Sequence, residues 1–409
     1  MSESQSPACR SCGFVELQTF LSLGRMPLAN ALLTEKQLDD PEETFPLEIA
    51  FCSACSLVQL TKSVSPEKLF REYVYFSSFS DTMLRHAEEL STQLIGSKRL
   101  DATSLVLEVA SNDGYLLQNY KRMGVQVLGI EPAVNIAEVA EQRGIRTVCD
   151  FFNDDLALQL FDEGYKADVI HANNVLAHVP DLNGFVRGLE RVLKEDGVIV
   201  VEVPYVKDMI DNCEFDTVYH EHLSYFSLTA LDALFTRNGL TIQKVERLPI
   251  HGGTLRIYAG RGCERDGSVV QLLAEERAWG VGEINFYKGF SARVERLRED
   301  LLALLHKLKS QKKRIAAYGA SAKGSTLLNY CGVGRETLDY VVDRSTVKQG
   351  LYTPGTHLKI YAPDKLLADT PDHVLLLTWN FADEILEQQS EYRKRGGRFI
   401  VPVPFVKVV

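Results

Sequence analysis

The sequence lacks three features that would assign it to other classes of protein. No apolar run approaches the roughly 18–20 residues that a membrane-spanning helix needs. The opening residues, Met-Ser-Glu-Ser-Gln-Ser-Pro, contain neither the basic region nor the apolar stretch of a secretion signal. Positive charge is not in excess, since 45 Lys and Arg stand against 55 Asp and Glu. We therefore expect a cytoplasmic protein without a nucleic-acid or membrane partner, because both partners attract an excess of cations.

The eight cysteines also lack the setting of a disulfide framework, because disulfides belong to oxidising compartments. Four of them form two Cys-x-x-Cys pairs, Cys9 with Cys12 and Cys52 with Cys55. Each pair places two sulfurs on one tight turn, and two pairs complete a tetrahedral thiolate site that is typical of structural zinc. Two disulfides or a chance spacing are the alternatives. Four thiolates leave no open coordination position, so we do not expect this metal to catalyse a reaction.

From residue 104 onward, short apolar runs alternate with segments long enough for helices, which predicts the parallel sheet of an α/β domain. These runs occupy residues 104–109, 125–130, 146–149, 167–172 and 197–203. Two alternating runs, 241–247 and 254–259, are predicted to add an antiparallel pair of strands. The charged amphipathic stretch 272–313 is predicted to be one long connecting helix, and residues 314–324 begin a second strand–loop–helix unit.

The turn after the first predicted strand of this domain is a candidate nucleotide-binding loop. Ala110, Asn112 and Gly114 stand where such α/β folds carry three small residues, which let the backbone turn sharply and a ligand approach. The ends of the following strands carry the other residues that we expect to bind this ligand: Glu131 for ribose hydroxyls, Asp150 and Phe151 for an adenine, and Asn173.

Two observations favour S-adenosylmethionine over NAD as the ligand of this loop. The loop lacks the three glycines that bind a diphosphate. The first strand also carries an acid, Glu108, which would repel a pyrophosphate but suits a sulfonium ligand without phosphate. NAD stays an alternative because Glu131 would fit its ribose equally well, and so does an α/β domain without a ligand, in which these residues only form turns.

A group of proton-transfer residues, Tyr-His-Glu-His at 219–222, follows the fifth strand. Histidine titrates near neutrality and can take up and return a proton, whereas His-Glu-His lacks the i, i+4 pair of a helical metal site. We predict His222 as the base, Glu221 as its orienting or stabilising neighbour, and Tyr219 as a hydrogen-bond donor. His178 and His251 are further candidates for the same cleft, although a lone histidine is more often structural.

The order of these motifs resembles that of bacterial S-adenosylmethionine-dependent deoxysugar C-methyltransferases of the tetronitrose type, which methylate C-3′ of nucleotide-linked 4-keto sugars. The motifs are Cys-x-x-Cys twice, Glu-Val-Ala-Ser-Asn-Asp-Gly, Gly-Ile-Glu-Pro, Asp-Phe-Phe, Tyr-His-Glu-His, Leu-Pro-Ile-His-Gly-Gly-Thr-Leu-Arg and Tyr-Gly-Ala-Ser-Ala-Lys-Gly. The resemblance implies a zinc-binding domain at 1–70, a class I methyltransferase domain at 71–290, and a smaller Rossmann-like α/β domain at 291–409 that holds the nucleotide sugar.

The same resemblance implies roles for individual residues. Tyr219 and His222 match the family's catalytic Tyr and His, and Tyr75 matches an aromatic residue near the methyl donor. Lys323 and Asn380 would face the nucleotide sugar. Ala110 departs from the Gly that is common in such domains, and we expect it to be tolerated where the turn does not need a positive φ.

In the C-terminal domain, the loop from Gly319 to Gly324 stands at a predicted helix start. Its backbone N–H groups, near Ser321, suit a pyrophosphate, and Lys323 would add a positive charge. A plain strand-to-helix turn is the alternative.

The predicted reaction is C-methylation, in which His222 removes the C-3′ proton and Tyr219 stabilises the enolate oxygen before the methyl group is transferred. Two other readings of the sequence stay open. One is O- or N-methylation of a small acceptor by the same donor domain, and the other is a zinc-stabilised nucleotide-binding protein without catalysis.

Overall fold

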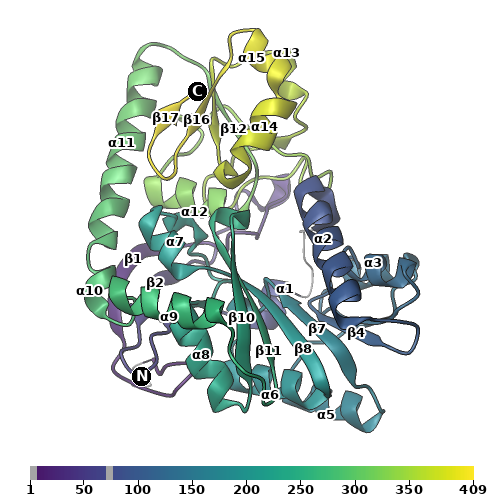
Figure 1. The fold of residues 1–409 in the computed structure, drawn as a ribbon. Coiled ribbons are helices and arrows are strands. Elements are labelled where there is room, and N and C mark those ends of the chain that lie inside the picture. Colours follow the sequence, from purple (N-terminus) through teal and green to yellow (C-terminus); the bar gives the residue numbers. More distant parts are fainter. Residues whose placement is uncertain (1–6, 71–76) are drawn as a thin grey trace.

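The computed structural model describes residues 7–70 and 77–409, whose strands form three sheets (Figure 1). The strand orders are β1-β2-β3-β9 in the N-terminal sheet, β10-β11-β8-β7-β4-β5-β6 in the central sheet and β14-β13-β12-β15-β16-β17 in the C-terminal sheet. The predicted α/β class, with a small cysteine-bearing part before two α/β domains, is confirmed. The predicted boundaries at 70/71 and 290/291 stay predictions.

The N-terminal sheet is antiparallel and receives one strand from a distant part of the chain. Its own strands are β1 (Gln18–Met26), β2 (Phe45–Phe51) and β3 (Val58–Leu60). The fourth strand, β9 (Ser224–Tyr225), pairs with β3 and is separated from the Tyr-His-Glu-His motif by Leu223 alone. The sheet therefore fixes one end of the segment that carries the predicted base.

The central sheet confirms the five predicted parallel runs and the antiparallel pair. Its parallel strands are β4 (Leu105–Val109), β5 (Gln126–Ile130), β6 (Thr147–Val148), β7 (Ala167–Asn173) and β8 (Leu193–Pro204). The antiparallel strands are β10 (Thr241–Leu248) and β11 (Thr254–Gly260). The chain runs from β4 outward to β6 and returns to β7 on the other side of β4. Ligands bind α/β sheets at such a reversal, at the carboxyl ends of the strands.

Helices cover both faces of the central sheet because successive residues of a buried strand point to opposite faces. In β4, Val106 packs with α2 (Asp81–Lys98) and α3 (Leu117–Arg122). The next residue, Leu107, belongs to the core with α5, α6 and α8. The helices of this domain that follow α3 are α4 (Val134–Gln142), α5 (Asp154–Asp162), α6 (Leu182–Val192), α7 (Val206–Asp211) and α8 (Leu228–Arg237).

The prediction of one continuous helix over 272–313 is wrong. The chain forms three helices there, α9 (Gly267–Trp279), α10 (Ile284–Tyr287) and α11 (Phe290–Ser310). Gly280 ends α9 with a left-handed φ of 75°, a conformation that glycine adopts without steric cost. The last helix, α11, runs along one side of the molecule from the N-terminal sheet to the C-terminal sheet (Figure 1).

The C-terminal sheet repeats the topology of the central one on a smaller scale. Its strands are β12 (Ile315–Tyr318), β13 (Val341–Val342), β14 (Ile360–Tyr361), β15 (His373–Leu376), β16 (Arg398–Val401) and the antiparallel β17 (Lys407–Val408). Its helices are α12 (Ala322–Cys331), α13 (Lys365–Asp369), α14 (Ala382–Gln388) and α15 (Ser390–Lys394). The order again reverses beside the first strand, so the glycine loop after β12 lies at the position where a ligand is expected.

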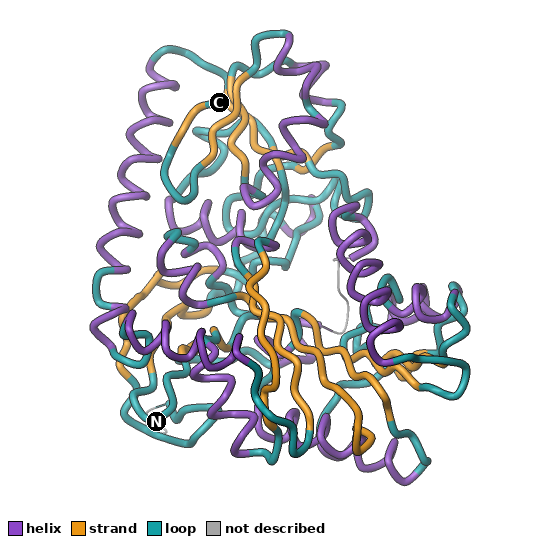
Figure 2. The backbone as a smooth tube through the Cα atoms, in the orientation of Figure 1, coloured by secondary structure: helices purple, strands orange, loops and turns teal. Residues whose placement is uncertain are grey.

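Short helical segments occupy several connections. They are α1 (Pro66–Phe70) and the 3₁₀ turns η1 (Glu35–Gln37), η2 (Ser77–Phe79), η3 (Leu176–His178), η4 (Phe215–Thr217), η5 (Ile250–Gly252) and η6 (Trp379–Phe381). Figure 2 shows that the loops at the strand ends of the central sheet and those of the C-terminal sheet face each other. Among the described residues, no helix combines the length and the apolar character that crossing a membrane requires.

Candidate active site

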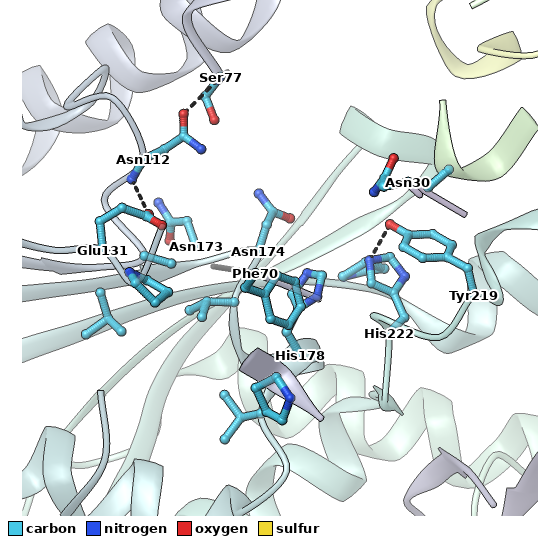
Figure 3. Close-up of a pocket in the computed structure, with 18 of the residues that line it drawn as sticks. Asn30, Phe70, Ser77, Asn112, Glu131, Asn173, Asn174, His178, Tyr219 and His222 are labelled. Carbon is cyan, nitrogen blue, oxygen red and sulfur yellow. Dashed lines mark hydrogen bonds between the residues drawn. The ribbon is translucent and has the colours of Figure 1, made fainter. Parts of the chain in front are cut away.

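A cavity of about 710 Å³ lies where the three parts of the chain meet. This volume is within the range of roughly 300–1,000 Å³ that small-molecule sites occupy. Figure 3 shows Asn112 and Glu131 on one side of it, Tyr219 and His222 on the other, and His178 between them. The predicted residues that line it are Ala110, Asn112, Glu131, Phe151, Asn173, His178, Tyr219, His222, Ser321, Lys323 and Asn380.

Glu131 connects the ends of β4 and β5, in the part of the cavity where we expect the methyl donor to bind. Its Oε2 accepts a hydrogen bond from the Asn112 N–H over 2.9 Å, and its Oε1 accepts one from the Ala133 N–H over 3.0 Å. Burial raises the pKa of Glu131 to about 7, against the opposing effect of these backbone N–H groups. The carboxylate therefore ties the loop after β4 to the end of β5, while it still lines the cavity.

The loop after β4 contains a strained position. Ala110, Asn112 and Gly114 have φ values of 55°, 49° and 77°. A Cβ on Gly114 would lie 2.8 Å from Cγ1 of Ile145, so glycine is required there. Asn tolerates this region, whereas Ala does not gain a local hydrogen bond that offsets the steric cost. The condition under which we expected Ala110 to be tolerated, a turn without positive φ, is therefore not met.

Glu108 and Asn173 differ in how they relate to the cavity. Glu108 is only 1% exposed and does not line the cavity. Burial raises its pKa well above the usual range, and the Glu131 and Asp113 carboxylates add to the rise. Asn173 lines the cavity, and its buried Oδ1 has no hydrogen-bond partner within the described part of the chain. This oxygen fits an N–H or O–H donor of a ligand.

Other residues that were predicted to bind the methyl donor or the acceptor do not line the cavity or lie outside the described residues. Asp150 is exposed, and its Oδ1 accepts a hydrogen bond from the Phe151 N–H over 2.7 Å. Gly114 shapes the loop without lining the cavity. Tyr75 lies outside the described residues. His251 belongs to η5 by its backbone, and its side chain is likewise outside what the structure describes.

The hydrogen bonds of His222 assign its tautomer. Its Nδ1 lies 2.9 Å from the carbonyl oxygen of Thr217, which can only accept a hydrogen bond, so Nδ1 carries the proton. In the neutral ring Nε2 is then the unprotonated nitrogen, and it accepts a hydrogen bond from the Tyr219 hydroxyl over 2.7 Å (Figure 3). A neutral imidazole with a basic Nε2 at the cavity is suited to accept a proton.

The two other residues predicted for catalysis have different surroundings. Glu221 is buried and does not line the cavity, and its Oε1 accepts a hydrogen bond from Nδ2 of Asn30 over 2.7 Å. His178 lines the cavity with its ring centre 4.9 Å from that of His222. Burial lowers the pKa of His178 to about 4, so its ring is neutral near pH 7. The structure thus brings both histidines together. Of the two, His222 is the one whose hydrogen-bond partners hold a basic ring nitrogen toward Tyr219.

The glycine loop of the C-terminal domain is already hydrogen-bonded in part. The N–H groups of Gly319, Ala320 and Gly324 donate to the Val342 carbonyl, the Asp343 carboxylate and the Ser321 hydroxyl. These three groups are therefore engaged within the protein, and Gly319 does not line the cavity. Ser321 and Lys323 do line it, and Nζ of Lys323 lies 4.6 Å from the ring centre of Trp379.

The structure adds lining residues that the sequence analysis missed. They include Asn30, Glu67 and Phe70 from the N-terminal part, and Thr217, Arg344, Lys348, Thr378 and Phe381. Arg344 and Thr378 follow β13 and β15, so the rule that ligands meet the carboxyl ends of parallel strands would have indicated them. Asn30 had no such signal, because only tertiary packing brings it to Glu221, 191 positions away in the sequence.

The four paired cysteines fit a zinc ion. A tetrahedron of Zn–S bonds of about 2.3 Å needs sulfur–sulfur distances of about 3.8 Å. All four Sγ atoms lie within 4.8 Å of one another, with Cys9 3.5 Å from Cys55 and Cys12 3.6 Å from Cys52. None of the four lines the cavity, which agrees with a structural ion.

Three family models match the chain: a zinc binding domain at residues 9–70, a methyltransferase domain at 83–245 and a C-methyltransferase C-terminal domain at 249–404. The C-methyltransferase NovU of Streptomyces niveus is 35% identical over 404 residues, which cover 98% of this chain and 96% of that protein. A ubiquinone biosynthesis O-methyltransferase of Bartonella quintana is 30% identical over 97 residues, 24% of this chain and 39% of that protein.

Among solved structures, the PH0226 protein of Pyrococcus horikoshii OT3 is similar with a TM-score of 0.37 and 14% identity, over 48% of this chain and 97% of that one. The family models, rather than this weak likeness, confirm the predicted cofactors. The central domain is a methyltransferase domain, for which S-adenosylmethionine was predicted, and the four cysteines fall within the zinc binding domain.

Proposed function

The chain belongs to the C-methyltransferase family, and from this membership we propose that it methylates C-3′ of a nucleotide-linked 4-keto deoxysugar. S-adenosylmethionine, when bound, supplies a methyl group made electrophilic by the positive sulfur. The order of the motifs and the three-part cavity support the sugar nucleotide as the acceptor. The single observation that carries the proposal is the assigned tautomer of His222 beside the Tyr219 hydroxyl.

The proposed proton transfer follows from these two hydrogen bonds. A hydrogen next to a ketone is acidic because the enolate spreads the negative charge onto oxygen. The Tyr219 hydroxyl would turn from His222 to the substrate oxygen and donate its hydrogen bond there. Nε2 of His222 would then be released to accept the C-3′ proton. The Thr217 carbonyl accepts from Nδ1 in both protonation states, so the ring keeps its orientation throughout.

The C-terminal wall of the cavity supports an acceptor that carries a diphosphate. Lys323 and Arg344 bring positive charge to a chain with a net charge of −10. The side chain of Arg344 remains 45% exposed while Nη1 contacts Glu384 over 3.4 Å. Ser321 and Asn380 add a hydroxyl and an amide. This combination of charge and hydrogen-bonding groups suits a phosphorylated ligand better than an apolar acceptor.

Deuterium exchange at C-3′ tests the proposal without methyl transfer. The protein is incubated in deuterated water with dTDP-linked or UDP-linked 4-keto-6-deoxyglucose, and label at C-3′ is followed by NMR. We expect exchange with the wild type and its loss in His222→Asn. His178→Asn is the matched control, because the same substitution is then made at a histidine whose ring is only 4.9 Å away. Unchanged exchange in His222→Asn would contradict the assigned base.

A second measurement separates C-methylation from O- or N-methylation. The donor carries a ¹³C-labelled methyl group, and the product is examined by two-dimensional NMR. A methyl group bonded to carbon gives a correlation to the ring carbon at C-3′ and survives acid hydrolysis of the nucleotide. Label found on oxygen or nitrogen would replace the proposed reaction by the alternative one.

A further inference from the structure

The segment 215–222, which carries Tyr219 and His222, is held by a buried hydrogen bond from the C-terminal domain. The indole Nε1–H of Trp379 donates to Oδ2 of Asp216 over 2.6 Å. Asp216 is 0% and Trp379 9% exposed, so water does not compete for this bond. We call it the Trp379–Asp216 contact. Its place in the fold is the point where η4 meets η6.

Asp216 is adjacent in sequence to the residue that orients the base. The carbonyl oxygen of Thr217 accepts the hydrogen bond from Nδ1 of His222. A second bond from the same domain, from Oγ1 of Thr326 in α12 to the Val218 carbonyl over 3.2 Å, holds the next peptide. The C-terminal domain therefore helps to fix the position of His222 through its hydrogen bond to Asp216.

Trp379 also touches the wall on which the nucleotide is proposed to bind. Its neighbours in sequence, Thr378 and Asn380, both line the cavity. Nζ of Lys323, another lining residue, lies over the indole ring at 4.6 Å. Burial raises the pKa of Asp216 to about 6, and the Lys323 ammonium opposes this rise. Lys323 thus acts on both members of the Trp379–Asp216 contact.

We propose that the Trp379–Asp216 contact couples binding of a nucleoside diphosphate at the C-terminal wall to the position of His222. The inference rests on the proposed function, because it takes His222 as the base and this wall as the nucleotide site. A ligand held by Lys323, Thr378 or Asn380 restrains Trp379, and Trp379 restrains Asp216 and the Thr217 carbonyl. Binding energy from the nucleotide, far from the reacting carbon, then appears in kcat rather than only in KM. Trp379 and Asp216 are positioning residues in this scheme.

The chain offers a matched control, because its two tryptophans are Trp279 and Trp379. Trp279 ends α9, lies under the Lys207 ammonium and does not line the cavity. We expect Trp379→Phe, which keeps an aromatic ring but removes the N–H donor, to lower kcat about tenfold. The Kd for S-adenosylmethionine should stay within about twofold in both variants, and Trp279→Phe should keep the wild-type kcat. A wild-type kcat in Trp379→Phe would overturn the proposal.

A conservative pair at Asp216 distinguishes the hydrogen bond from simple packing. Asp216→Asn keeps an oxygen that accepts the indole N–H, whereas Asp216→Leu fills the same space without one. We expect kcat to fall further in Asp216→Leu than in Asp216→Asn, while the KM for the methyl donor is unchanged in both. Equal kcat values in the two variants would contradict the role of the bond.

Amide hydrogen exchange tests the coupling directly, independently of turnover. The exchange of residues 215–222 is measured by mass spectrometry with and without UDP or dTDP. We expect either nucleotide that binds to slow this exchange in the wild type, and to do so much less in Trp379→Phe at saturating nucleotide. Binding of the nucleotide is measured separately in Trp279→Phe, by the fluorescence of its remaining tryptophan, Trp379.

The outcomes separate this inference from the proposed function. If His222→Asn keeps C-3′ exchange, the assigned base is wrong, but the effect of nucleotides on 215–222 is still readable. If nucleotides bind without slowing exchange of 215–222 in the wild type, the coupling is overturned while the base assignment stands. Failure of both UDP and dTDP to bind the wild type would overturn the coupling as well.

Discussion

Arg10 contacts Leu223, the residue that follows His222. The guanidinium Nη1 of Arg10 donates to the Leu223 carbonyl over 3.4 Å and to the Leu60 carbonyl over 2.6 Å. Arg10 stands between Cys9 and Cys12, so the first cysteine turn is attached to the segment that carries the proposed base. Because β9 also pairs with β3, the zinc domain fixes one end of this segment and the C-terminal domain fixes the other.

Removal of zinc should therefore disturb the active site as well as the N-terminal domain. Without the ion the four thiols lose the ligand that holds their two turns together, and zinc binding contributes directly to the folding of such domains. We expect a strong chelator, or Cys52→Ser, to lower the first unfolding transition by at least about 10 °C and to abolish C-3′ exchange. Calorimetry and metal analysis measure both effects. Cys149→Ser, at an exposed cysteine that is not one of the four clustered ones, serves as the control.

Arg10→Met tests the link itself. This variant keeps all four cysteines and should keep zinc, but it removes the donors to Leu60 and Leu223. We expect a full zinc content together with a lower rate of C-3′ exchange. A normal exchange rate would limit the role of the zinc domain to folding.

Ala110→Gly should stabilise the protein. A φ of 55° costs an L-residue roughly 1–2 kcal/mol, and the greater freedom of glycine in the unfolded chain offsets part of this gain. We expect the free energy of unfolding to rise by about 0.5–1 kcal/mol in urea titrations. Ala133→Gly is the control, because Ala133 has an ordinary φ of −80° and should lose stability on the same change. A loss of stability in Ala110→Gly would show that its Cβ makes contacts that outweigh the strain.

The parallel strands could be predicted because a strand buried on both faces is a continuous apolar run, as residues 167–172 illustrate. The long helix was mispredicted because Gly280 was not taken as a helix end, although glycine commonly ends helices; it ends α9 in the left-handed conformation. Loop residues at strand ends, such as Glu131, were found by their place after an apolar run. The sequence therefore predicts those parts of the site that lie at the ends of strands.

Contacts between distant segments could not be read in this way. Asn30 meets Glu221, and Trp379 meets Asp216, through packing of whole domains, and neither pair has a local sequence pattern. The left-handed conformation of Ala110 was equally hidden, because alanine is not a residue that marks this region. Periodicity reports local structure, whereas these features depend on tertiary structure.

Glu131 should make stability fall as pH rises. Burial raises its pKa from 4.5 to about 7 in the folded protein, so between these pH values the folded chain holds a proton that the unfolded chain has lost. Stability is then greatest below pH 4.5 and declines up to about pH 7, by about 3 kcal/mol from this group. Glu131→Gln should remove this part of the decline in urea titrations between pH 5 and about pH 8. Glu138→Gln, at an exposed position on α4, should leave it unchanged. An identical pH profile in wild type and Glu131→Gln would contradict the raised pKa.

Arg344 should hold the diphosphate of the acceptor. It follows β13 at the C-terminal wall. Its Nη1 lies 3.4 Å from Oε1 of Glu384, whose Oε2 accepts a hydrogen bond from the Thr82 hydroxyl of α2 over 3.0 Å. A guanidinium that is 45% exposed keeps donors available for phosphate oxygens, and hydrogen bonds between charged groups contribute roughly 1.5–3 kcal/mol. Arg344→Met should therefore weaken UDP or dTDP binding by at least about tenfold in calorimetry, more at low salt, with donor binding unchanged. Arg393→Met, at an exposed position on α15, should bind as the wild type does. A wild-type affinity in Arg344→Met would contradict this role of Arg344 and would favour Lys323 as the residue that holds the diphosphate.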